Sequence, residues 1–405
     1  MKTIRGHYSE AIVFTDLIEE TAISQIQTLC DQPFVKDCKI RVMPDVHAGS
    51  GCVIGFTADL GELVIPNIVG VDIGCGMLTI ELGKSEPDYE LLDRTIHEDI
   101  PAGMAVYDEP VAAFDSMDDF LCVDQLKNLS WIKCSIGTLG GGNHFIEIDK
   151  DDEGTFYLVI HTGSRNLGKQ VAEYYQQLAI DKLIGKLNLH ERQRKLIEDY
   201  KASGRSHEIQ SALREMKTGT SGSAIPKELC YLAGDDRTAY LHDMKLCQEY
   251  AKLNRGMIAA RILNRVFHSN LETTPHFETI HNYIDYESNV IRKGAVSAKL
   301  GQQLIIPINM RDGSLICIGK GKQEWNCSAP HGAGRLFSRA EARRKFTVSA
   351  YANEMDGIYT SSVCEETLDE CPMAYKPIQS ILENISPTVD VVKVIKPTYN
   401  FKAAD

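Results

Sequence analysis

The amino-acid sequence predicts an α+β fold: a single large mixed-sheet domain over residues 1–405, with a mainly helical insertion at residues 168–268. Two observations predict it. Short runs rich in β-branched residues, bounded by Gly, Pro or Asp, occur before residue 180 and return near residue 295, and such runs are typical of strands. Between them, apolar residues recur at helical spacing. Because strands and helices do not alternate regularly, a mixed sheet is favoured over a doubly wound parallel sheet.

The segments expected to be extended are short, and polar residues follow several of them. Residues at strand ends commonly form functional sites, so these positions are the first to consider. In chain order the segments are Lys39–Val42, Cys52–Phe56, Val64–Val71, Met77–Leu82, Phe156–Ile160, Ala295–Ile306, Leu315–Ile318 and the tail Val389–Lys402.

Three helices are expected in the insertion, at Lys169–Leu187, Glu191–Lys217 and Thr238–Phe267. In the last of them, apolar residues such as Met244 and Ile258 recur along one helical face. A stripe of this kind is typical of a helix that packs one face against a core.

Composition and charge exclude several classes of protein. The formal net charge is −13, from 43 basic and 56 acidic residues, so the chain lacks the overall basic character of many nucleic-acid-binding proteins. An anionic substrate therefore needs a local pocket or a bound cation. The 12 cysteines are scattered without a CxxC pair, which suits a reducing compartment. The N-terminus lacks the apolar core of a signal peptide, and Asp72 interrupts the most apolar stretch. We therefore expect a cytoplasmic protein with no membrane span.

Candidate metal ligands lie in short glycine-rich stretches. Asp72 and Cys75 are three residues apart in a loop flanked by glycines, so both can reach one cation. His144, His161 and His281 could complete the coordination shell. Thiolate, imidazole and carboxylate together suit Zn, Mn, Fe or Co better than Mg or Ca. The alternative is that Cys75 is an ordinary buried residue, Asp72 a turn cap and the histidines satisfied core residues.

Two further stretches suggest phosphate chemistry. The glycines at 140–142, followed by Asn143, could cradle a phosphate through backbone N–H groups, although a plain turn explains them as well. His331 precedes Gly-Ala-Gly and then a basic segment, because residues 335–346 hold five basic and one acidic residue. This arrangement places an imidazole beside a positive helical face, or beside an ordinary solvated helix.

Taken together, these motifs resemble those of the RtcB-type RNA-splicing ligases, from about Arg41 to Lys402. Any one motif is modest, but the same order of all of them is specific. The motifs are MPDVHAGSG (43–51), GVDIGCGM (70–77), GTLGGGNHFIE (137–147), HTGSR (161–165), HNY (281–283), RKGAVSA (292–298) and SAPHGAGR (328–335).

The resemblance implies a ligase that uses GTP and manganese. Such an enzyme joins RNA ends bearing a 2′,3′-cyclic phosphate or 3′-phosphate to ends bearing a 5′-hydroxyl, in RNA repair or tRNA splicing. His331 would become covalently guanylylated. Cys75 would bridge two manganese ions, with Asp72 and His144 completing one site and His161 and His281 the other. The implied nucleotide-binding residues are Asn143, Glu147, Asn309, Gly332, Ala333, Gly334, Tyr375 and Lys402. The residues expected near the RNA or its phosphates are Asp45, His47, Arg165 and Arg335.

One segment departs from the family pattern. The usual IPGSMG is IPINMR here, so Asn309 replaces a serine hydroxyl and Arg311 adds a cation where glycine is usual. The change bears on nucleotide preference. Two other readings remain open: a metal-dependent phosphoesterase or nuclease, and an inactive protein that binds nucleotides or RNA ends. His331 separates the first of these from a ligase, because a hydrolase uses metal-bound hydroxide and forms no covalent guanylate.

Overall fold

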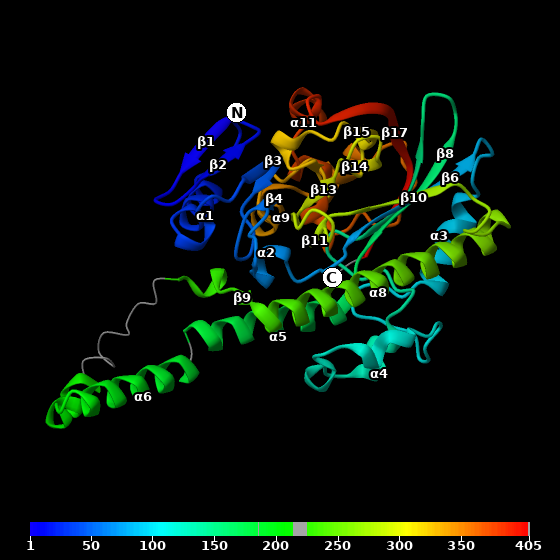
Figure 1. Ribbon diagram of the computed structural model, residues 1–405. Coiled ribbons are helices and arrows are strands. Elements are labelled where there is room, and N and C mark those ends of the chain that lie inside the picture. Colours follow the sequence, from blue (N-terminus) through cyan, green and yellow to red (C-terminus); the bar gives the residue numbers. More distant parts are fainter. Residues whose placement is uncertain (185, 214–224, 404–405) are drawn as a thin grey trace.

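The computed structural model describes residues 1–184, 186–213 and 225–403. Two large sheets lie on one side of the long helix α8 (Gly234–Phe267), and α4 (Leu129–Cys134) lies on its other side (Figure 1). Helix α6 (Lys186–Ala202) extends away from the sheets. The mixture of sheets and separate helices confirms the predicted α+β class. The division into one domain with a helical insertion stays a prediction.

The first sheet has six strands, of which only the β2–β3 pair is parallel. A register shift in the β3–β4 pair marks a bulge in the second half of β3, and bulges commonly re-aim a side chain. In spatial order the strands are β1 (Lys2–Arg5), β2 (Glu10–Val13), β3 (Ile40–His47), β4 (Ile54–Ala58), β12 (Ile291–Lys293) and β11 (Asn282–Ile284).

The second sheet has seven antiparallel strands and nearly closes on itself. Its two edge strands approach each other, and a hydrogen bond joins them: the backbone N–H of Ile305 donates to Thr279 Oγ1 at 3.1 Å. In spatial order the strands are β10 (His276–Ile280), β6 (Gly76–Gly83), β8 (Phe156–Thr162), β7 (Phe145–Lys150), β17 (Val389–Lys402), β15 (Gly313–Gly319) and β14 (Gln303–Asn309).

Two short strand pairs complete the β-structure, β13 (Ala295–Ser297) with β16 (Ser328–Pro330) and β5 (Leu63–Val64) with β9 (Leu232–Ala233). The prediction of one strand over Val64–Val71 is wrong. The strand ends at Val64 and the short helix α2 (Pro66–Val69) follows, since proline is favoured in the first turn of a helix. Gly70 ends α2 with a φ of 97°.

Most helices lie outside the sheets, and their bounds differ from the predicted ones by a few residues. Helix α6 ends at Ala202, well before the predicted Lys217; residues 214–217 lie outside the described residues. Other α-helices include α1 (Glu20–Cys30), α3 (Tyr89–Asp99), α5 (Arg165–Leu183), α9 (Arg339–Lys345), α10 (Val348–Glu354) and α11 (Ile378–Ile385). Short 3-10 helices occur at Pro33–Val35, Asp115–Asp119, Val123–Gln125, Ser206–Glu208, Lys227–Leu229, Gln323–Trp325, Leu368–Glu370 and Pro372–Ala374.

Helix α8 connects the core to the loops that carry the candidate ligands. Met244 and Ile258 are fully buried, as the apolar stripe predicts. The same helix also buries Asn254, whose Oδ1 accepts backbone N–H groups of residues 137 and 138 at 2.7 and 3.1 Å. Nη1 of the buried Arg255 donates to the carbonyls of Gly74 and Thr162, both at 2.9 Å. These polar side chains hold glycine-rich loops against a rigid helix.

None of the described helices is long and apolar enough to cross a membrane.

Candidate active site

The candidate metal ligands lie at one edge of the seven-stranded sheet. Cys75 precedes β6, His161 is near the end of β8, His144 precedes β7 and His281 follows β10. These four strands are neighbours in the order β10, β6, β8, β7. His161 is directly opposite Met77 in one pair and Phe145 in the next. The antiparallel register therefore brings four side chains from distant motifs to the same end of the sheet.

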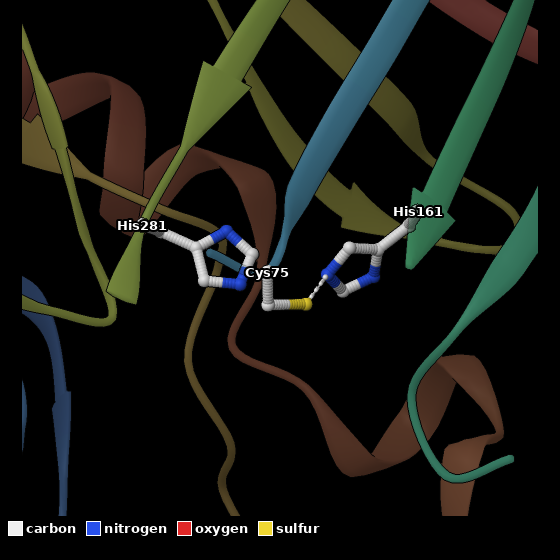
Figure 2. A group of neighbouring side chains, drawn as sticks. All are labelled: Cys75, His161 and His281. Carbon is white, nitrogen blue, oxygen red and sulfur yellow. Dashed lines mark hydrogen bonds between the residues drawn. The ribbon is translucent and has the colours of Figure 1, made fainter. Parts of the chain in front are cut away.

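Two groups of three ligands share the Cys75 thiol. In one group Asp72, Cys75 and His144 have their ligand atoms within 4.8 Å of one another, and in the other Cys75, His161 and His281 do so. The Sγ atom of Cys75 is 3.5 Å from Nε2 of His144 and 3.3 Å from Nε2 of His161. Figure 2 shows this sulfur lying between the rings of His161 and His281. A shared thiolate is the ligand that can bridge two cations.

Backbone carbonyls orient two of the imidazoles. Nδ1 of His144 lies 2.9 Å from the carbonyl of Leu139, and Nδ1 of His161 lies 3.1 Å from that of Asn143. Because a carbonyl can only accept, each Nδ1 carries a hydrogen, and Nε2 is the ring nitrogen that faces Cys75. This second hydrogen bond is the usual way to fix a metal-binding histidine.

Burial determines the protonation of this cluster. It lowers the pKa of His161 well below its usual range, and the nearby His144 lowers it further. Burial and then His331 do the same to the pKa of His281, so both rings are neutral ligands. Burial, and then Asp72, raises the pKa of the Cys75 thiol, so a bound metal would have to displace its proton.

Asp72 is the one carboxylate in the cluster. Burial raises its pKa, but the hydrogen bond from His144 outweighs that effect and brings the pKa to about 2. The two groups are 3.0 Å apart, from Oδ2 to Nε2. Glycine is required at 163, because a Cβ atom there would lie 2.1 Å from Oδ1 of Asp72. Asp72 is therefore an ionised ligand in a tightly packed loop.

The donor set fits a transition-metal ion. Nδ1 of His281 is buried and has no hydrogen-bond partner among the described residues. A buried polar atom without a partner is unusual in a folded protein, and a role in binding an ion is one recognised explanation. Thiolate, imidazole and carboxylate ligands match Zn, Mn, Fe or Co.

His331 lies next to the cluster, on a loop that follows β16. Its ring centroid is 5.0 Å from that of His281. The buried carboxylate of Asp45, on the bulged part of β3, accepts from His331 twice: from the backbone N–H at 3.1 Å and from Nδ1 at 2.6 Å. Since Nδ1 carries the hydrogen, Nε2 is left with a lone pair. An oriented imidazole of this kind can act as a nucleophile.

Lys376 stabilises the strand that carries Asp45. Its buried ammonium group donates to the carbonyls on either side of Asp45, those of Pro44 and Val46, both at 3.1 Å. Its backbone N–H donates to the carbonyl of Gly334, three residues after His331, at 3.0 Å. Lys376 therefore links the segment of the carboxylate to the segment of the imidazole.

A cavity of about 240 Å³ opens beside His331 and the cluster. The predicted residues that line it are His47, Asn143, Glu147, His161, His281, Asn309, His331, Gly332, Ala333, Gly334, Arg335, Tyr375 and Lys402. Asp72, Cys75 and His144 are not among the residues that line it. The structure thus brings the predicted nucleotide-binding residues together around the space next to His331.

One wall of the cavity is organised by Glu370, which the sequence analysis missed. This buried carboxylate accepts from Lys402 Nζ at 2.9 Å, Arg335 Nη1 at 3.0 Å and Tyr375 Oη at 2.5 Å. Burial raises the pKa of Glu370, but Lys402 and then Arg335 outweigh it, and the pKa falls to about 2. A single sequence offers no signal that separates Glu370 from the other acidic residues.

Two of the residues expected near the RNA or its phosphates, Asp45 and Arg165, do not line the cavity. Asp45 is fully buried against His331. Arg165 donates to Thr138 Oγ1 at 3.2 Å and to the carbonyl of Gly103 at 3.0 Å, so its guanidinium group stabilises a loop. A Cβ atom at Gly140 would lie 1.7 Å from that guanidinium group, so the close packing of Arg165 requires a glycine here.

Part of the charge of the basic segment 335–346 is neutralised by ion pairs. Besides the Arg335–Glu370 pair, Arg343 of α9 forms an ion pair with Asp369 at 2.9 Å, and Arg339 lies 3.5 Å from the same carboxylate. These pairs reduce the positive charge that residues 335–346 show in sequence.

The segment that departs from the family pattern turns its cation away from the cavity. Asn309 lines the cavity, but its Oδ1 accepts the backbone N–H groups of Arg311 and Asp312 at 3.0 and 2.9 Å. The side chain of Arg311 forms ion pairs with Asp312 and with Glu354 of α10. Arg311 is therefore part of a surface network and does not line the cavity.

Comparison with known proteins agrees with this arrangement. Residues 25–125 and 123–403 match the family model described as tRNA-splicing ligase RtcB, and the chain belongs to this family. The RNA-splicing ligase RtcB of Escherichia coli (strain K12) is 29% identical over 94% of this chain and 93% of its own length. The tRNA-splicing ligase RtcB of Nanoarchaeum equitans is 27% identical over 84% of this chain and 83% of its own. That of Aeropyrum pernix is 26% identical, over 92% and 90%.

Proposed function

We propose that this protein is a GTP- and manganese-dependent RNA ligase. It joins an RNA end carrying a 3′-phosphate or 2′,3′-cyclic phosphate to an end carrying a 5′-hydroxyl, in RNA repair or tRNA splicing. The observation that carries the proposal is the hydrogen-bonded pair of His331 and Asp45. The ring centroid of His331 is 5.0 Å from that of His281, and His331 lines the cavity. The names of the relatives, which are RNA- or tRNA-splicing ligases, support the same conclusion.

The first step is attack of His331 Nε2 on the α-phosphorus of GTP. A phosphorus–nitrogen bond forms and pyrophosphate leaves. Asp45 holds the proton on Nδ1 throughout and stabilises the positive charge that develops on the ring. Two manganese ions held by the ligands that share Cys75 would supply neutralisation of the phosphate charge.

The second and third steps transfer GMP and then expel it. An oxygen of the RNA 3′-phosphate attacks the phosphorus of the bound GMP, the bond to His331 breaks, and the activated RNA end carries GMP. The 5′-hydroxyl of the other RNA then attacks the RNA 3′-phosphorus, releases its proton to solvent and displaces GMP. A 2′,3′-cyclic phosphate must first be opened by water. A covalent intermediate divides one difficult exchange into easier steps.

The cavity wall suits a nucleotide. Lys402 and Arg335 are cations held in place by Glu370, and Tyr375 adds a ring beside them. Asn143 and Glu147 form part of the same lining. In the proposed role these groups bind GTP so that its α-phosphorus faces His331.

The His331–Asp45 pair favours a ligase over a metal-dependent phosphoesterase or nuclease. A hydrolase activates water on its metal and needs no second, carboxylate-oriented imidazole beside the metal ligands. Retention of an ionised carboxylate, neutral imidazoles and an open cavity also argues against an inactive binder.

The test is ligation of end-defined RNAs. Purified protein is incubated with GTP, manganese and two oligonucleotides, one ending in a 3′-phosphate and one beginning with a 5′-hydroxyl. We expect a joined product that requires GTP and manganese, and none with 3′-hydroxyl and 5′-phosphate ends. Shortened or dephosphorylated RNA without joining would establish the hydrolase instead.

A further inference from the structure

Behind the cavity wall, Asp149 is a buried carboxyl group that the proposed reaction does not use. It is 0% exposed, and neither of its oxygens accepts a hydrogen bond from a donor among the described residues. It follows Glu147 by two residues on β7, so both side chains point to the same face of the strand. Glu147 lines the cavity, whereas Asp149 does not.

The polar side chains on the neighbouring strands form hydrogen bonds with residues other than Asp149. Tyr157 is directly opposite Asp149 on β8, but its hydroxyl donates to Asp151 at 3.0 Å. Lys393 of β17 also donates to Asp151, at 2.6 Å. Pro397, the residue opposite Asp149 on β17, has no donor. An ionised carboxylate buried here would lack any compensating cation, which is very costly.

Asp149 is therefore a neutral acid. Burial, and then the charge of Glu147, raises its pKa well above the usual range. A neutral carboxylic acid has one O–H donor, and Glu147 is its hydrogen-bond partner on the same face of β7. Asn400 of β17 donates Nδ2 to Oε2 of Glu147. Burial raises the pKa of Glu147, while the hydrogen bonds from Asp149 and Asn400 oppose that rise, and the cavity lies in front of Glu147.

We propose that Asp149 is a positioning residue that remains protonated and donates its O–H to Glu147, so that Glu147 stays an ionised acceptor for the base of a purine nucleotide. This inference rests on the proposed function. An ionised carboxylate accepts from two adjacent N–H donors, the edge that guanine offers, whereas adenine presents an acceptor beside its amino group. If Glu147 carried the proton itself, it would offer a donor and lose this discrimination.

The first experiment measures the protonation of Asp149 and requires neither nucleotide nor enzymatic activity. Infrared difference spectra at neutral pH are recorded for the wild type against Asp149→Asn. We expect the carbonyl stretching band of a protonated carboxylic acid in the wild type and its absence from the variant. The same band in both proteins, or in neither, would overturn the proposal.

The second experiment measures the preference of the protein for GTP over ATP. GTP and ATP dissociation constants are compared for the wild type, Asp149→Asn and Asp149→Leu. Asparagine donates an N–H permanently, so we expect Asp149→Asn to keep wild-type preference for GTP. Leucine removes the donor, and we expect GTP binding to weaken about 10- to 100-fold with little change for ATP, as is usual when a buried polar group loses its partner. Equal loss in both variants, or none in Asp149→Leu, would reject the role.

Two controls separate this role from folding and from the proposed function. Circular dichroism and bound metal should match the wild type in both variants, and Asp151→Asn, which removes a carboxylate two residues further along β7, should leave GTP preference unchanged. A wild type that binds no nucleotide would contradict the proposed function and the selecting role together, while the infrared band would still report whether Asp149 is protonated.

Discussion

The metal-ligand cluster and the His331–Asp45 pair are neighbours, but they are built in different ways. Cys75, His144, His161 and His281 come from the ends of adjacent strands in one sheet, so strand register alone brings them together. His331 follows β16 and meets a carboxylate from β3 of the other large sheet. The first arrangement depends on a continuous hydrogen-bonded sheet, and the second on contacts between separate segments of chain. Metal binding and guanylyl transfer should therefore be separable by substitution.

The largest expected effect is at the shared thiol. Cys75→Ala removes a ligand from both groups of three, so we expect loss of bound manganese and, with it, loss of ligation. Metal per chain is measured by elemental mass spectrometry, with Cys364→Ala, at a half-buried cysteine outside the cluster, as the control. Two metals retained by Cys75→Ala, with normal ligation, would show that the thiol does not bridge.

Loss of the Asp45 carboxylate should affect the His331–Asp45 pair and leave the metal-ligand cluster intact. Asp45→Ala leaves Nδ1 of His331 without its acceptor, and we expect the rate of protein guanylylation to fall about 100-fold or more. Bound metal should stay at the wild-type level. Loss of metal in this variant would mean that the two regions are not independent.

A smaller effect is expected one step further away. Lys376→Met removes the ammonium group that fixes the carbonyls of Pro44 and Val46 around Asp45. We expect guanylylation to slow about tenfold, a change of about 1.4 kcal/mol in the barrier, with an unchanged GTP dissociation constant. Lys376→Arg should recover part of the rate. A guanylylation rate equal to that of the wild type in Lys376→Met would show that Lys376 does not help to position Asp45.

A further effect is on stability in acid rather than on reaction rate. The pKa of Glu370 falls from an ordinary 4.5 to about 2, so the unfolded chain binds more protons than the folded one in this range. The stabilisation is present above pH 4.5 and is lost as the pH falls towards 2, up to about 3 kcal/mol. Glu370→Gln should therefore show a shallower loss of unfolding free energy over this range in denaturant titrations. Parallel curves for the two proteins would contradict the depressed pKa.

The sequence predicted the two regions unequally. The metal ligands could be predicted because they lie in short recognisable motifs, most of them rich in glycine, and because thiol, imidazole and carboxylate side chains are the usual ligands of metal ions. The pairing of Asp45 with His331 could not be predicted, because the two residues are 286 positions apart in the sequence and meet only in the fold. Glu370 and Lys376 are ordinary charged residues until burial shows what they contact.

The fold shows the same division. Strong β-branched runs and the long apolar stripe of α8 were predicted within a few residues, because their patterns are local. Three-residue strands such as β11 and β12 are formed by pairing with neighbours and leave little trace in sequence. Pro66 overrode an otherwise strand-like run by starting a helix.

The central claim is that Nε2 of His331 becomes covalently guanylylated, and peptide mapping tests it most directly. The wild type and His331→Ala are incubated with GTP and manganese, digested under mildly alkaline conditions and analysed by mass spectrometry. We predict one GMP on the peptide that contains His331, lost on acid treatment, and no adduct in the His331→Ala variant, which still binds its metals. GMP on another residue, or an equal adduct in His331→Ala, would contradict it.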